Sequence, residues 1–120
     1  MKLKNTARAL LISLVAGTPA MAGAPVVEKA TANCSGQTCS FSVTISHGDT
    51  GWDHYADGWG VYTTDGKELG YRVLHHPHVD EQPFTRSLSG VKIPDGVKTV
   101  VIIPRDSVHK LGEGVKVSIP

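Results

Sequence analysis

The segment HHPHVDEQPF, residues 75–84, holds three histidines, two acids and two prolines within ten residues. Pro77 biases the backbone of His76 towards an extended conformation, and alternate residues of an extended segment share a face. We therefore expect the side chains of His76, His78 and Asp80 to point the same way. Imidazole and carboxylate ligands in that arrangement suit Zn(II), Cu(II) or Ni(II), so the segment predicts an edge that binds a divalent transition metal.

Three further histidines, His47, His54 and His109, lie in other polar segments. We include them in the candidate metal-ligand set, with His54 or His109 adding an imidazole from a neighbouring loop. Asp53 and Asp57 are expected to orient histidines by hydrogen bonding behind the metal ligands. The alternative stays open: the same side chains form a polar network of surface ion pairs, each worth up to about 1 kcal/mol.

These side chains are positioned by β-strands. Short alternating or apolar runs recur between turn signals, and this pattern predicts an all-β protein. Asp65-Gly66 and Pro94-Asp95-Gly96 mark turns between strands, and Pro104 is expected to end the sixth strand because proline lacks a backbone donor. Seven strands are expected, at residues 25–30, 40–46, 58–64, 68–75, 84–93, 97–103 and 114–119.

Seven antiparallel strands predict an Ig-like or fibronectin-III-like sandwich, with a small barrel as the alternative. Because successive strands run in opposite directions, every second loop falls at the same end of the domain. All six histidines lie in loops that belong to one end. The opposite end carries the plain turns CSGQTC, TDGK and IPDG.

The N-terminal segment MKLKNTARALLISLVAGTPAMAGAP has a basic start, a short apolar run and the small residues Ala20 and Ala22. It predicts a signal peptide over residues 1–22, cleaved after Ala22, and one domain over residues 23–120. The apolar run is shorter than the ~20 residues that span a bilayer, so we expect a periplasmic or secreted protein without a stable membrane anchor. The leader takes three of the twelve bases and none of the eleven acids, which leaves nine against eleven and a net charge of −2. Such a surface has no basic stripe for nucleic acid.

Cys34 and Cys39 frame the turn CSGQTC. In an oxidising compartment this pair predicts a disulfide, which stabilises a loop of this length by about 2 kcal/mol. A redox or metal-binding thiolate pair is the alternative, but such pairs favour CxxC spacing and a neighbouring positive charge.

The segment TGWDHYADGW, residues 50–59, carries much of the aromatic content. Trp59 starts a strand and is expected in the core. Trp52 and Tyr55 lie in a polar loop and, with Asp53 and Arg86, form a candidate surface for an unknown protein or small ligand. The alternative is that the two aromatic rings cap the end of the sandwich. We expect Arg86 to pair with Glu81.

Catalytic motifs are weak. Ser107, His109 and Asp106 are sequence neighbours without a nucleophile elbow, and the adjacent Asp80 and Glu81 would face opposite ways in an extended segment. An enzyme is therefore not favoured. Two other classes are expected: a metal-binding or metal-handling module, and an interaction domain that uses the same loops.

Three stretches, TGWDHYADGW, HPHVDEQPFTRSLSG and RDSVH, resemble small exported single-domain proteins of Gram-negative bacteria to which no activity is assigned. The chain is also weakly similar to superoxide reductase, an Ig-like sandwich with histidines at its iron site. That resemblance implies a cysteine thiolate ligand to iron. The chain has only Cys34 and Cys39, both expected in the disulfide, so the activity is not carried over.

Overall fold

A computed structural model of the chain describes residues 23–120, so the predicted signal peptide, residues 1–22, lies outside the described residues. The described part contains strands, turns and loops and no helix, which confirms the all-β prediction. It has eight strands: β1 Val26–Ser35, β2 Thr38–Ser46, β3 Ala56–Thr63, β4 Glu68–Val73, β5 Phe84–Lys92, β6 Thr99–Asp106, β7 Lys110–Leu111 and β8 Val115–Ser118. Over residues 23–120, no helix has the length and apolar character needed to cross a membrane.

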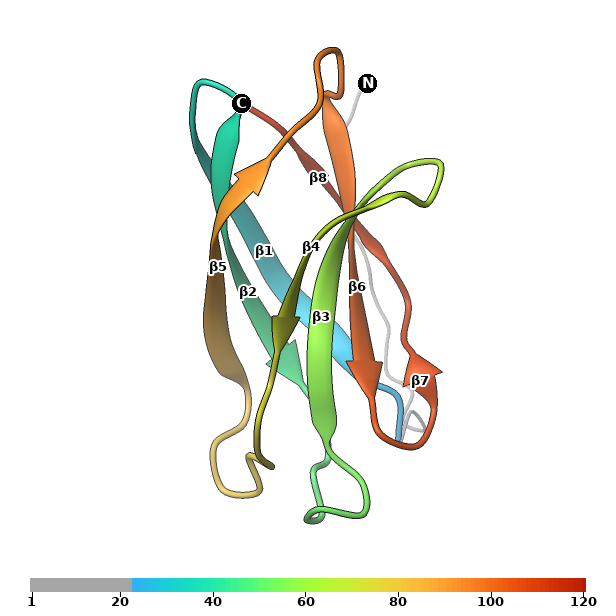
Figure 1. The fold of residues 1–120 in the computed structure, drawn as a ribbon. Helices are drawn as coiled ribbons and strands as arrows, with labels where there is room; N and C mark the ends of the chain where they lie inside the picture. The colour runs from blue at the N-terminus through green and yellow to red at the C-terminus, as the bar shows by residue number, and fades with distance from the viewer. Residues whose placement is uncertain (1–22) are drawn as a thin grey trace.

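The strands form two antiparallel sheets packed face to face (Figure 1). One sheet has the order β1-β2-β5, and the other has the order β4-β3-β6-β7, with β8 also paired to β6. The fourth strand pairs with the third strand and not with the fifth. The domain is therefore an antiparallel Ig-like or fibronectin-III-like sandwich, as the strand pattern predicts.

The first strand is longer than the sequence pattern indicates, because it continues to Ser35 and forms a long hairpin with β2. Cys34 and Cys39 face each other at the closed end of this hairpin and are joined by a disulfide. The predicted bridge is confirmed. It fixes the hairpin at the end of the domain opposite the histidines.

The expectation that Pro104 ends the sixth strand is wrong, because β6 runs on to Asp106. On one side of β6, β8 pairs with Thr99 to Ile102, and β7 pairs with Arg105 and Asp106. Pro104 lies between these two stretches, where its carbonyl oxygen accepts a hydrogen bond from Gly112 N at 2.8 Å. The missing backbone donor therefore falls at a break in strand pairing, which a proline tolerates. The two-residue strand β7 has no alternating pattern and was not predicted.

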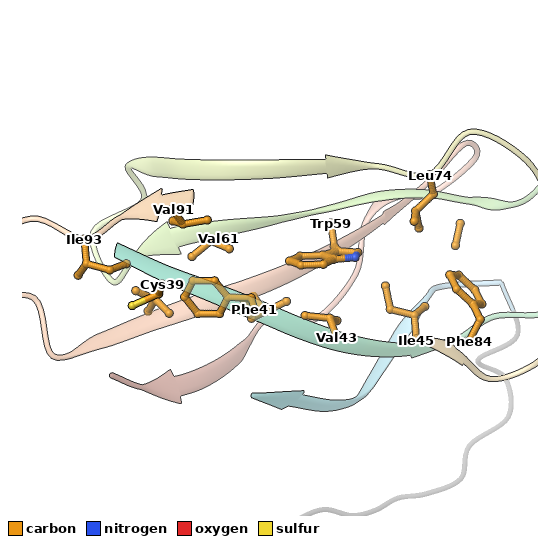
Figure 2. Close-up of a cluster of buried hydrophobic side chains, with 13 residues drawn as sticks. Cys39, Phe41, Val43, Ile45, Trp59, Val61, Leu74, Phe84, Val91 and Ile93 are labelled. Atoms are coloured by element: carbon orange, nitrogen blue, oxygen red, sulfur yellow. The ribbon is translucent and has the colours of Figure 1, made fainter. Parts of the chain in front are cut away.

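The core lies between the sheets and follows from strand alternation. Phe41, Val43 and Ile45 point inwards from β2 and are almost completely buried, and Trp59 on β3 is 0% exposed. The prediction of Trp59 as a core residue is confirmed. Figure 2 shows these side chains filling the space between the two sheets. A rigid apolar core of this kind fixes the strand ends, and with them the loops that carry the polar side chains.

The turns β1–β2, β3–β4 and β5–β6 lie at one end of the sandwich, and the connections β2–β3, β4–β5 and β6–β7 lie at the other (Figure 1). This arrangement agrees with the expectation from strand direction. All six histidines belong to the second set of connections or to their immediate flanks.

Candidate metal centre

Three imidazoles meet at one carboxylate at the histidine-bearing end. Asp106 is the last residue of β6, and its side chain is completely buried. Its Oδ2 lies 3.0 Å from His47 Nε2, 3.0 Å from His54 Nε2 and 2.9 Å from His109 Nδ1. His47 directly follows β2, His54 lies in the β2–β3 loop, and His109 lies in the β6–β7 turn. These four residues are called the Asp106 cluster.

The donor atoms of the cluster are spaced for a metal ion. One ligand atom from each of His47, His54 and Asp106 lies within 4.8 Å of the others. Ligands that bind Zn²⁺ at about 2.0–2.2 Å lie roughly 3 Å from one another in a tetrahedral site. Two imidazole nitrogens and a carboxylate oxygen are ligands suited to Zn(II), Cu(II) or Ni(II). His109 places a third imidazole against the same carboxylate oxygen.

The second carboxylate oxygen of Asp106 organises the β6–β7 turn. Oδ1 accepts hydrogen bonds from the backbone N–H groups of Val108 and Lys110, each at 3.1 Å, and from that of His109. This turn holds His109 beside the cluster. Burial by itself raises the pKa of Asp106, but the hydrogen bonds from His109, His54 and His47 outweigh it and hold that pKa well below its usual range.

Both ring nitrogens of His47 face oxygen atoms. Its Nδ1 contacts Asp49 Oδ1, and a carboxylate oxygen only accepts, so Nδ1 carries a proton. Its Nε2 lies 3.0 Å from Asp106 Oδ2 and 2.7 Å from the carbonyl oxygen of Gly23, two further acceptors. A neutral imidazole would direct a lone pair at both oxygens. A cation bound at Nε2 would satisfy both oxygens.

Asp49 contacts His47 on the side of the ring opposite Asp106, and it is also buried. Besides its contact with His47, its Oδ1 accepts from Ala56 N at 3.2 Å, and its Oδ2 accepts from His78 N at 2.7 Å. A carboxylate on the far nitrogen of a metal-binding histidine fixes the tautomer and the orientation of the ring. Asp49 is placed to do this for His47.

Gln82, in the β4–β5 loop, hydrogen-bonds to both His47 and His78. Its side-chain oxygen accepts from His47 N at 2.9 Å, and its side-chain nitrogen donates to the carbonyl oxygen of His78, also at 2.9 Å. The β4–β5 loop is therefore tied to the end of β2 by side-chain hydrogen bonds. His47 is held by this loop as well as by its own strand.

The expected chelating edge of His76, His78 and Asp80 does not form a ligand group within residues 23–120. His78 is buried and stacks on Phe84 with ring centroids 3.9 Å apart, and its Nε2 accepts from Arg86 at 3.1 Å. Burial, followed by the charge of Arg86, lowers the pKa of His78. His76 lies beside it, with ring centroids 4.7 Å apart, and is exposed, as is Asp80. The physical reason is that Phe84 offers an apolar surface that turns His78 inwards.

Asp57 does not orient a histidine as expected, because its Oδ2 pairs with Arg105 Nη1 at 2.5 Å. Asp53 is exposed. The predicted pair of Arg86 and Glu81 is present at 3.3 Å.

The two loop aromatics lie outside the cluster. Trp52 is 67% exposed and meets Tyr55 edge to face, with ring centroids 5.5 Å apart. Ser107 Oγ accepts from Tyr55 N at 3.1 Å. These contacts build the outer surface of the β2–β3 loop, and the candidate interaction surface stays a prediction.

The cluster opens to solvent through a shallow depression. Its lining includes His47, His54 and His109 together with Gly23, Gln82 and Val108. The side chains of His54 and His109 are 23% and 43% exposed, whereas those of His47 and Asp106 are fully buried. An ion can therefore reach the cluster from one side.

Sequence reasoning missed three parts of this site: the central position of Asp106, the supporting role of Asp49 and the contribution of Gly23. Asp106 and His109 stand three residues apart in RDSVH, and an aspartate at a strand end is a known signal for a side-chain-capped turn. That signal could have placed Asp106 beside His109. No sequence signal marks the carbonyl oxygen of Gly23.

Comparison with known proteins gives little on function. No family model and no solved structure matches the chain. A protein of the archaeon Halomicrobium mukohataei described as "Putative lipoprotein" is 42% identical over 89 residues, which is 74% of this chain and 43% of that protein. The chain thus spans less than half of this relative, whose description states no activity.

Proposed function

We propose that the protein is an exported metal-binding module that holds a divalent transition-metal ion in the Asp106 cluster. His47 Nε2, His54 Nε2 and one oxygen of Asp106 are the ligands, with His109 within reach as a further imidazole. Asp49 orients His47. The expected role is metal binding or metal handling and not catalysis.

The observation that carries the proposal is the arrangement of acceptors around His47 Nε2. That nitrogen faces Asp106 Oδ2 at 3.0 Å and Gly23 O at 2.7 Å while Nδ1 is engaged with Asp49. His54 Nε2 faces the same two oxygens at 3.0 and 3.1 Å. A metal ion among these atoms would replace repulsion between lone pairs by coordination.

The alternative is a protonated network in which imidazolium rings surround Asp106 and bind no metal. Two features favour the metal. The cluster opens to solvent on one side, and the carboxylate behind His47 is the arrangement that supports metal-binding histidines. A network that served only stability would need no open side.

Export is supported by two independent observations. The Cys34–Cys39 disulfide is typical of proteins that fold in an oxidising compartment, and the relative from Halomicrobium mukohataei carries the name of a lipoprotein. The basic and apolar N-terminal segment agrees with them. We propose that the protein acts in the periplasm or outside the cell.

Calorimetric titration of chelator-stripped protein, residues 23–120, with Cu(II), Zn(II) and Ni(II) tests this function. We expect at least one ion to bind with a Kd of about 1 μM or tighter. His54→Ala should weaken binding by at least about 10-fold, because it removes a ligand. Binding should also weaken as the pH is lowered, since protons compete with the metal for imidazole nitrogens.

The matched control is His76→Ala, which removes an exposed imidazole outside the cluster. It should leave the affinity unchanged. If no ion binds more tightly than about 100 μM, or if His76→Ala weakens binding while His54→Ala does not, the Asp106 cluster is not the metal site.

A further inference from the structure

Gly23 lies inside the Asp106 cluster. Its carbonyl oxygen is 2.7 Å from His47 Nε2 and 3.1 Å from His54 Nε2. A Cβ atom added to Gly23 would lie 2.4 Å from Cε1 and 2.8 Å from Nε2 of His109, and the residue has a φ of +112°. A side chain at this position would therefore meet the ring of His109 and would be strained by the positive φ, which favours glycine.

The chain that follows Gly23 is fixed to the sandwich. Pro25 is fully buried, and β1 begins at the next residue. A Cβ added to Gly112 would lie 2.6 Å from the carbonyl oxygen of Pro25, so the two backbones are in direct contact. Gly23 is therefore held two residues from a firmly packed position.

Processing of the chain changes the chemistry of this residue. The nitrogen of Gly23 is a peptide nitrogen while Ala22 is attached, and a protonated peptide nitrogen is not a metal ligand. Cleavage after Ala22, the expected signal-peptide site, converts it into an α-amine, which can offer a lone pair to a metal ion. This amine is bonded to the Cα atom that His109 flanks.

We propose that removal of the signal peptide completes the metal site, with the α-amine of Gly23 as a ligand beside His47, His54 and Asp106. This inference rests on the proposed metal-binding function. The amine nitrogen and the carbonyl oxygen of a single glycine can close a five-membered chelate ring on one ion. A ligand set rich in nitrogen favours Cu(II), which stands highest in the affinity order of divalent metals.

The proposal gives signal cleavage a function beyond release of the protein. The precursor lacks one nitrogen ligand and binds the ion weakly, whereas the processed protein binds it tightly. Metal uptake is thereby confined to protein that has been exported and cleaved. Gly23 is required in this role because any other side chain would collide with His109.

The test compares two proteins that differ by one residue. One begins at Gly23, and the other retains Ala22 and so begins one residue earlier. Both are titrated with Cu(II) alone by calorimetry, and their Cu(II) forms are examined by electron paramagnetic resonance. We expect the extra alanine to weaken Cu(II) binding at least about 10-fold and to change the nitrogen hyperfine pattern. The thermal midpoint of the metal-free proteins should be the same.

Each other outcome contradicts the inference in a distinct way. Equal Cu(II) affinity in both proteins, lost in both on His54→Ala, removes the α-amine from the site and leaves the proposed function intact. A lower thermal midpoint of the metal-free protein that retains Ala22, relative to the protein that begins at Gly23, would show that the N-terminus acts by packing and not as a ligand. No Cu(II) binding by either protein removes the proposed function together with the inference.

Discussion

Asp106→Asn is expected to abolish metal binding and to lower the free energy of unfolding by about 3 kcal/mol. The carboxylate is completely buried, and its two oxygens serve different groups: Oδ2 faces three imidazoles, and Oδ1 accepts three backbone N–H groups of the β6–β7 turn. An amide removes the charge and presents an N–H₂ group to atoms that need an acceptor. Breaking a buried charged network by removing one partner costs about 3–5 kcal/mol.

Chemical denaturation of the metal-free proteins at pH 7, together with titration of Cu(II) and Zn(II), measures both effects. Asp80→Asn, which removes an exposed carboxylate at the same end of the domain, is the control and should change stability by less than about 0.5 kcal/mol. The account of Asp106 is contradicted if the Asn variant retains metal affinity, or if its stability stays within that same range.

The pH dependence of the free energy of unfolding provides a second test of Asp106→Asn. The pKa of Asp106 is lowered in the folded protein, so below its unfolded value of about 3.9 the unfolded state binds a proton that the folded state does not. The stabilisation by Asp106 is complete above that pH and is lost as the pH falls towards the folded pKa. Between pH 4 and pH 2, stability should therefore fall more steeply in the parent protein than in Asp106→Asn, by up to about 1.4 kcal/mol per pH unit.

Asp49→Asn is expected to lower the free energy of unfolding by about 2–3 kcal/mol and metal affinity by 10- to 100-fold. Asp49 accepts hydrogen bonds from His47 Nδ1, Ala56 N and His78 N. An asparagine has one acceptor oxygen for these three donors and leaves at least one buried donor without a partner, which costs about 1–3 kcal/mol. Loss of a carboxylate behind a metal-binding histidine typically costs 10- to 100-fold in affinity.

The same two measurements apply to Asp49→Asn, with Asp53→Asn as the control because Asp53 is an exposed aspartate in the same loop. Metal affinity equal to that of the parent protein would show that His47 needs no support from Asp49. A loss of affinity in Asp53→Asn of the same size would show that the effect arises from net charge and not from the hydrogen bonds of Asp49.

Much of the fold could be predicted from local pattern. The alternation of Phe41, Val43 and Ile45 gives a half-buried strand, and the turns at Gly66 and Gly96 set the direction of the chain. Strand direction then placed the histidine-bearing loops at one end. The path of β6 past Pro104 could not be predicted, because it depends on a gap between its partner strands β7 and β8, and the two-residue β7 leaves no pattern in the sequence.

The composition of the site was predictable in part. His47, His54 and His109 were placed in the candidate ligand set from residue type and loop position, and the structure brings them together on Asp106. Asp106 was considered only beside Ser107 and His109 as a weak catalytic set, and its central position was missed because its buried side chain requires β6 to continue beyond Pro104. The segment around His76 and His78 was weighted too strongly, because extended geometry alone does not show that Phe84 draws His78 into the interior.

Anomalous X-ray diffraction from crystals of residues 23–120 grown with Zn(II) or Cu(II) tests the central claim most directly, because it locates the ion. The account predicts one strong peak about 2.0–2.3 Å from His47 Nε2, His54 Nε2 and an oxygen of Asp106. A peak at His76 in place of this position, or no peak among these three residues at saturating metal, would contradict it.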